Sequence, residues 1–130
     1  MAGLVISLKP NEKFLVNGAL LMNGPKRGQI CITDDSVSVL RMSDVLHPSE
    51  INTPVRRAYY AAQLVLSCDA TAEEMDAEIC DRLDTLIEVF DGTPLLKAIE
   101  KARKAAEIER YYSVLCALKP LLPVEEQLLA

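Results

Sequence analysis

The stretch NTPVRRAYYAAQ, residues 52–63, begins the helical part of the chain. Asn52 and Thr53 are residues that cap helices, and Pro54 suits the first helical position, where a missing N–H costs nothing. The sequence therefore predicts a helix over roughly 54–67. Its buried face carries Val55, Tyr59, Ala62 and Leu66, and a second face carries Arg56, Tyr60, Gln63 and Ser67. That second face can meet a base, a phosphate or a partner protein.

The residues after this stretch carry the signals of two further helices. Thr71 and Glu74 form a capping box, in which each side chain accepts a backbone N–H of the other's residue. A third helix is predicted from about residue 94, and its pattern extends without a break to about residue 118. The tail at 120–130 begins with a proline and is too apolar for a solvated linker.

The pattern of the residues before this stretch predicts five short strands. Apolar runs at 4–8, 13–16, 19–22, 29–33 and 36–42 are separated by turn signals, of which Asn17-Gly18 predicts a tight hairpin. The predicted fold class is α+β, with a small five-stranded antiparallel sheet or partial barrel followed by three main α-helices, the last one long. We expect an N-terminal β region at 1–45 and a C-terminal helical region at 46–130 within one compact unit.

The composition is that of a globular protein. Among 130 residues, 50% are hydrophobic and 25% are charged, which is enough to form a core. No apolar run is long enough to cross a membrane, and the N-terminus lacks the basic and apolar regions of a secretory signal. Four cysteines without a C-x-x-C pair predict neither a zinc site nor a disulfide framework. They are interpreted as buried free thiols in a reducing cytoplasm, so we expect a cytoplasmic protein.

The sequence shows no pattern typical of an enzyme. Its one histidine, His47, precedes a proline in a predicted loop and has no matched nucleophile. The segment GPKRG at 24–28 lacks the phosphate-binding loop pattern, and a solvent-exposed turn explains it. The carboxylates between residues 73 and 84 are spread around a helix rather than paired across a cleft. We therefore expect no catalysis, no cofactor and no metal.

Charge is distributed unevenly along the chain. Residues 1–60 carry seven basic and five acidic side chains, a balance of +2, whereas residues 61–130 carry seven basic and fourteen acidic ones, a balance of −7. Any nucleic-acid contact should lie in the first half, since the second would repel a polyanion. Cations and an aromatic face that suit single-stranded RNA are Lys9, Lys13, Lys26, Arg27, Arg41, Arg56, Arg57 and Tyr60. Alternatively, Arg56 pairs with an acid of the second helix and the tyrosines pack helix on sheet.

Three stretches resemble the flagellar biosynthesis repressor FlbT family over essentially the whole chain: ISLKPNEKFLVNGALLMN, HPSEINTPVRRAYYAAQL and ARKAAEIERYYSVLCALKPLLPVE. The resemblance implies a cytoplasmic bacterial regulator that acts after transcription. It would associate with the 5′ untranslated leader of flagellin mRNA, affect its translation or stability, and work opposite a small flagellar partner, FlaF. The resemblance assigns no functional residues to positions in this sequence.

A second likeness concerns only the first third of the chain. LVISLKPNEKFLVNG resembles in rhythm the start of the CsrA family, small five-stranded RNA-binding regulators that form interlaced dimers. This likeness implies that the sheet is the RNA platform and that the protein is a dimer. A generic β-hairpin region explains the same residues.

The apolar end of the third predicted helix and the tail after it must be buried somewhere. A second copy of the chain is one possibility, and folding back onto the protein's own sheet is the other. Candidate partner or oligomer contacts are Ile108, Tyr112, Leu115, Leu121 and Leu122. An alternative function follows from the acidic helical half: a protein adaptor that binds a flagellar chaperone, a flagellar regulator or flagellin and affects RNA indirectly.

Overall fold

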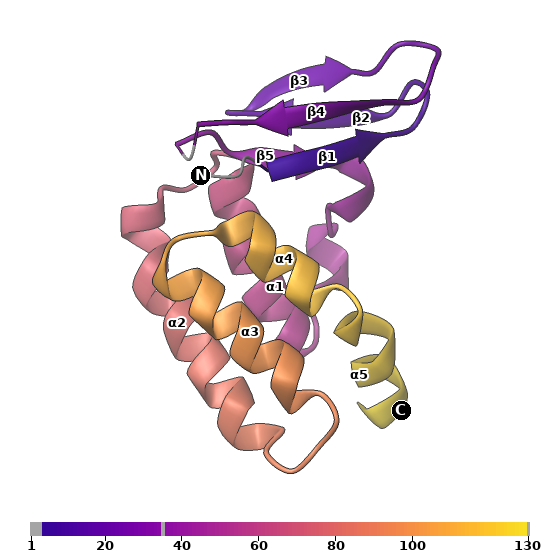
Figure 1. Ribbon diagram of the computed structural model, residues 1–130. Helices are drawn as coiled ribbons and strands as arrows, with labels where there is room; N and C mark the ends of the chain where they lie inside the picture. The colour runs from indigo at the N-terminus through magenta and orange to yellow at the C-terminus, as the bar shows by residue number, and fades with distance from the viewer. Residues whose placement is uncertain (1–3, 35, 130) are drawn as a thin grey trace.

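The computed structural model describes residues 4–34 and 36–129. The strands gather on one side of the molecule and the helices pack on the other (Figure 1). The described strands are β1 (Leu4–Leu8), β2 (Lys13–Val16), β3 (Ala19–Met22), β4 (Gly28–Ile32) and β5 (Val39–Arg41). The described helices are α1 (Pro54–Leu66), α2 (Ala72–Val89), α3 (Leu96–Glu107), α4 (Tyr111–Leu118) and α5 (Leu121–Leu129), preceded by the 3-10 turns η1 (Met42–Asp44) and η2 (Pro48–Glu50). This order confirms the α+β class.

The prediction of a single five-stranded sheet is wrong, because the described strands form two sheets. One pairs β1 with β4, and the other has the order β3-β2-β5, with antiparallel pairing in both. Ile6 and Leu8 of the first sheet and Phe14 and Val39 of the second are buried in one shared cluster. Two sheets enclose these apolar side chains between them, which a single open sheet does not achieve.

The predicted hairpin at Asn17-Gly18 is confirmed. These two residues join β2 to β3 and have φ angles of 51° and 82°, the positive values that a tight two-residue turn requires. The Asn17 side chain also accepts the Ser38 N–H at 2.9 Å, which fastens the turn to the segment before β5. The hairpin is thus fixed both by its own backbone and by its neighbour.

Helix α1 confirms the prediction for the stretch at 52–63. The Thr53 side chain caps it by accepting the Arg56 N–H at 3.2 Å, and Pro54 is its first residue. The predicted inward residues Val55, Tyr59, Ala62 and Leu66 are all buried. Gln63, by contrast, does not face solvent: its amide accepts the Leu46 N–H at 2.8 Å and donates to the Leu46 carbonyl at 3.1 Å.

The prediction of one long third helix is wrong, because α3 and α4 are separate helices. At the end of α3, Glu109 takes a left-handed φ of 57°. The Glu109 and Arg110 N–H groups then donate to the carbonyls of Ala106 and Ala105 at 3.0 and 2.9 Å, which is the Schellman pattern of helix termination. The chain turns back so that α4 packs against α3 and α1 (Figure 1). The apolar residues of α4 are thereby buried instead of projecting on a rod.

The apolar tail forms α5 and folds back onto α1 and α4, rather than onto the sheet. Leu121 of α5 is buried, and Glu125 has 0% exposure. The Glu125 carboxylate accepts the Val55 N–H at 2.9 Å, at the N-terminus of α1, where the helix dipole favours a negative charge. Its neighbour Glu126 is exposed and lies 3.5 Å from the Arg56 guanidinium. Glu125 is therefore a cap for α1 supplied from the far end of the chain.

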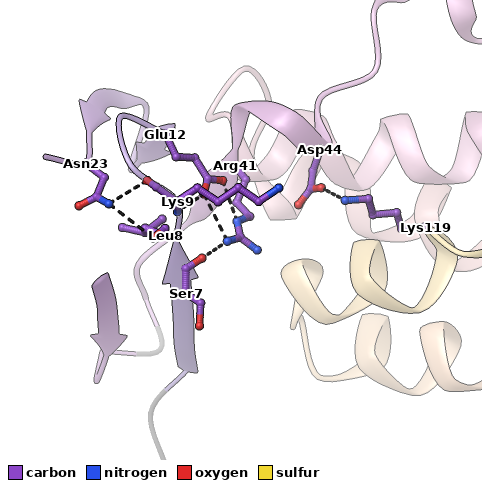
Figure 2. Close-up of polar contacts among 8 residues, drawn as sticks. All are labelled: Ser7, Leu8, Lys9, Glu12, Asn23, Arg41, Asp44 and Lys119. Carbon is purple, nitrogen blue, oxygen red and sulfur yellow. Dashed lines mark hydrogen bonds and ion pairs between the residues drawn. The ribbon is translucent and has the colours of Figure 1, made fainter. Parts of the chain in front are cut away.

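Arg41, at the end of β5, links the two sheets to each other (Figure 2). Its guanidinium lies 3.0 Å from the Glu12 carboxylate and also donates to the Ser7 carbonyl of β1. Three residues on, Asp44 pairs with Lys119, which follows α4. One set of polar contacts therefore joins the two sheets, and the Asp44–Lys119 ion pair joins the segment after β5 to the end of α4.

The cysteines are free, as expected, but the expectation that they are buried is wrong. Cys31, Cys68 and Cys116 are exposed and Cys80 is half-buried. Cys31 lies on β4, whose residues are largely exposed, and Cys68 has a left-handed φ of 64° in the turn that ends α1. Edge and turn positions place Cys31 and Cys68 at the surface in spite of their apolar sequence neighbours, and Cys116 is exposed on α4.

Replacing Glu125 by alanine tests the cap on α1. We expect Glu125→Ala to lower the free energy of unfolding by about 1–3 kcal/mol, because the buried Val55 N–H loses its partner. The adjacent Glu126→Ala is the matched control, since its carboxylate is 68% exposed and should contribute at most about 1 kcal/mol. Urea denaturation of both variants measures the difference. Equal effects would contradict the capping role.

Glu12 predicts a sensitivity of the β region to acid. The Lys9 N–H and then the Arg41 charge hold the pKa of Glu12 below its ordinary 4.5, against the opposing effect of burial. A lowered pKa stabilises the fold at pH values above 4.5, and this contribution is lost as the pH falls below that value. Glu12→Gln should therefore lower stability at neutral pH and flatten its decline in acid. Urea titrations over this range check the expectation, and an acid decline as steep in Glu12→Gln as in the wild-type chain would contradict it.

Candidate nucleic-acid interface

Four of the predicted RNA-binding residues lie on neighbouring turns of the β region. Lys9 follows β1, Lys13 begins β2, and Lys26 and Arg27 precede β4. All four are exposed. We call Lys9, Lys13, Lys26 and Arg27 the basic end. It is the kind of surface that contacts successive phosphates without reading sequence.

The side chain of Asn23 holds these turns together. Its amide nitrogen donates to the Lys9 carbonyl at 2.8 Å and to the Lys26 carbonyl at 3.0 Å, and Figure 2 shows it directed toward the turn that follows β1. The backbone adds a second tie, from the Asn11 N–H to the Gly24 carbonyl at 2.9 Å. The sequence predicted only a solvent-exposed turn at 24–28, so the role of the preceding Asn23 in joining two turns was missed. An Asn-Gly pair by itself gives no sign of so distant a partner.

The nearest acid in these turns is directed inward. The Glu12 carboxylate accepts the Lys9 N–H at 2.9 Å and pairs with Arg41, and its side chain is only 10% exposed. It therefore pairs with Arg41 and also interacts with the charge of Lys9, while Lys13, Lys26 and Arg27 have no such acid in these turns. Arg27 also lines a shallow hollow with Ser7, Leu8, Gly28 and Gln29. The basic end thus keeps its positive charge beside a small recess.

The other predicted RNA-binding residues lie elsewhere. Arg41 is held between the two sheets by Glu12 and Ser7. Arg56, Arg57 and Tyr60 lie on α1, where Arg57 is exposed and the other two are half-buried. Arg56 pairs with Glu126 of α5 at 3.5 Å, not with an acid of α2. The structure therefore divides the predicted set into the basic end, an internal arginine and a separate group on α1.

The five predicted partner contacts differ in exposure. Leu115 and Leu121 are buried in the core of the chain itself, and Tyr112 and Leu122 are half-buried. Ile108, in the turn between α3 and α4, is 64% exposed. Ile108 and Tyr112 also line a larger open cavity between this turn and residues 32–34 and 36–39. Folding back of the tail thus uses much of the apolar surface that was considered for a partner.

His47 has a local structural role. Its Nδ1 lies 2.9 Å from the Ser49 hydroxyl and accepts the Ser49 N–H at 3.3 Å, so it caps η2. Among residues 4–34 and 36–129, no cluster of three histidine, cysteine or acidic side chains is placed to hold a metal ion. The helices of the same described residues include none that is both long and apolar enough to span a membrane.

Comparison with known proteins gives one consistent result. The family model described as flagellar protein FlbT matches residues 4–129. A probable flagellum biosynthesis repressor protein FlbT of Caulobacter vibrioides (strain NA1000 / CB15N) is 31% identical, over 95% of this chain and 87% of its own length. The protein of the same description from Caulobacter sp. (strain K31) is 32% identical, over 95% and 94%. That of Chelativorans sp. (strain BNC1) is 31% identical, over 96% and 85%.

No solved structure matches the chain. The match to the family model nevertheless covers both the strands and all the described helices, from β1 to the end of α5. The relatives likewise extend over nearly the whole chain. The chain therefore belongs to the FlbT family of flagellar proteins.

Proposed function

We propose that this protein regulates flagellin synthesis after transcription, by binding the 5′ untranslated leader of flagellin mRNA in the cytoplasm and changing its translation or stability. The basic end is the observation that carries the RNA contact: Lys9, Lys13, Lys26 and Arg27 are exposed on turns joined by Asn23. Relatives described as flagellum biosynthesis repressors support a regulatory role over an enzymatic one.

The charge distribution favours the β region as the RNA-binding side. Residues 61–130 have a balance of −7 and would repel the phosphate backbone. A leader would accordingly contact the turns at 9–13 and 23–27 through its phosphates, with the helices facing solvent or protein. Phosphate contacts of this kind position an RNA and give a strong dependence on salt.

A second function is favoured by the cavity at the turn between α3 and α4. It combines the exposed Ile108 with the half-buried Tyr112, and it lies between the helices and residues of the β region such as Val37. Such a surface suits a protein partner, and a FlaF-type flagellar regulator is the partner we propose for it. In that case the protein is an adaptor and its effect on RNA is indirect.

Charge reversal separates these functions. We expect Lys26→Glu with Arg27→Glu to weaken binding of a flagellin leader about tenfold or more near physiological salt. The slope of log affinity against log salt should also fall by about one for each lost phosphate contact. Lys101→Glu with Lys104→Glu on α3 is the matched control, because both lysines are exposed and the change in net charge is the same. Binding is measured by titration against the leader and a scrambled RNA at several salt concentrations.

A second pair, Arg56→Glu with Arg57→Glu, tests whether α1 extends the RNA surface. We expect weaker leader binding here also, since both arginines lie in the half of the chain with net positive charge. Because Arg56 pairs with Glu126, unfolding of this variant must be measured alongside. Leader binding that is unchanged in both double variants would overturn direct contact and favour the adaptor.

A further inference from the structure

Strand β3 is unusual because it is apolar and yet wholly exposed. All of its residues, Ala19–Met22, are exposed, with Leu20 at 62%, Leu21 at 41% and Met22 at 62%. Edge strands are normally protected by lysine, proline, a bulge or a covering loop. β3 carries neither a charge nor a proline.

The outer edge of β3 is open within the described residues, where β3 pairs only with β2. The two-residue turn makes Val16 and Ala19 a hydrogen-bonded pair, and pairs then alternate along the hairpin. Leu15 with Leu20, and Lys13 with Met22, are accordingly non-hydrogen-bonded pairs. The backbone N–H and C=O groups of Leu20 and Met22 therefore point away from β2, toward the open edge.

We propose that β3 pairs with β3 of a second copy of this chain, in an antiparallel arrangement that continues the sheet across a two-fold axis. The outward groups of Leu20 face those of Met22 in the second copy, and the axis passes between the two Leu21 residues. Leu20 then packs beside Met22 on one face, and Leu21 packs beside its own copy on the other. The proposal does not depend on the RNA contact.

A second copy fits this edge because the edge is complementary to itself: the outward backbone groups of Leu20 and Met22 lie two residues apart, so each set meets the other in a two-fold arrangement centred on Leu21. In an antiparallel pair, the end of β3 that leads to Lys26 and Arg27 lies next to the Asn17-Gly18 turn of the other copy. Each basic end thus lies beside the hairpin turn of the other copy rather than beside the other basic end, which avoids repulsion between the two sets of cations.

Light scattering across a dilution series tests the proposed pairing of β3 with β3 of a second copy. We expect the full chain to be a dimer at micromolar concentrations, and Leu20→Lys with Met22→Lys to make it a monomer with unchanged circular dichroism. Val89→Lys with Leu128→Lys is the control and should remain dimeric, because these residues are equally exposed, at 61% and 59%, but lie on α2 and α5. A wild-type chain that is monomeric throughout would overturn self-pairing and leave the edge to another protein. A dimer that survives the β3 variant would also overturn it.

Cross-linking tests the register. Facing residues of a non-hydrogen-bonded antiparallel pair have Cα atoms about 4.5 Å apart, within the range that a disulfide spans. In a background with serine at Cys31, Cys68 and Cys116, Leu21→Cys should form a covalent dimer on mild oxidation. Leu20→Cys should not, because its thiol faces Met22 of the second copy instead of its own equivalent. Equal cross-linking of the two variants, or none at Leu21, would overturn the proposed pairing.

Discussion

Burial of α1 on almost every side is the constraint on which the rest of the structure depends. Val55, Ala58 and Ala62 have 0% exposure, because α2, α4, α5 and β5 all contact this helix. Its alanines leave room for these neighbours to approach closely, as dense interior packing requires. Even Gln63 is buried and holds the backbone of Leu46. Because α1 supports so many elements, most of its surface is used in packing, and Arg57 stays exposed on it, whereas the cations of the basic end lie in turns of the β region.

The elements that the sequence predicted correctly are those decided by adjacent residues. Thr53 caps α1, and Asn17-Gly18 closes the hairpin, from signals that span a few positions. The turn between α3 and α4 has no such signal, since Glu109 adopts a left-handed φ of 57° although it is neither glycine nor asparagine. The burial of α4 against distant helices favours that turn. The choice of β1 over β5 as the partner of β4 is likewise a long-range effect, because sequence pattern does not identify which strands pair.

The candidate site shows the same limit. Lys26 and Arg27 were predicted to be exposed from the turn chemistry around them, and they are. Arg41 is an arginine like Arg27, but its partner Glu12 is 29 residues away in the chain and holds Arg41 between the two sheets. Arg56 was considered for a pair with α2, yet its partner, Glu126, lies in α5. Residue type therefore identified the cations, and only the folded structure distinguishes those that are exposed from those that are already paired.

The RNA contact and the β3 pairing that we propose would have a joint consequence. An antiparallel seam at β3 would place the two basic ends at opposite ends of one continuous sheet, because each follows the C-terminal end of its own β3. A leader long enough to contact both would gain from effective concentration, without any new kind of contact. The affinity would then depend on protein concentration as well as on salt, since a monomer offers only one set of cations. The balance of −7 over residues 61–130 keeps a polyanion away from the helices, so a bound leader would run along the sheet rather than across the molecule.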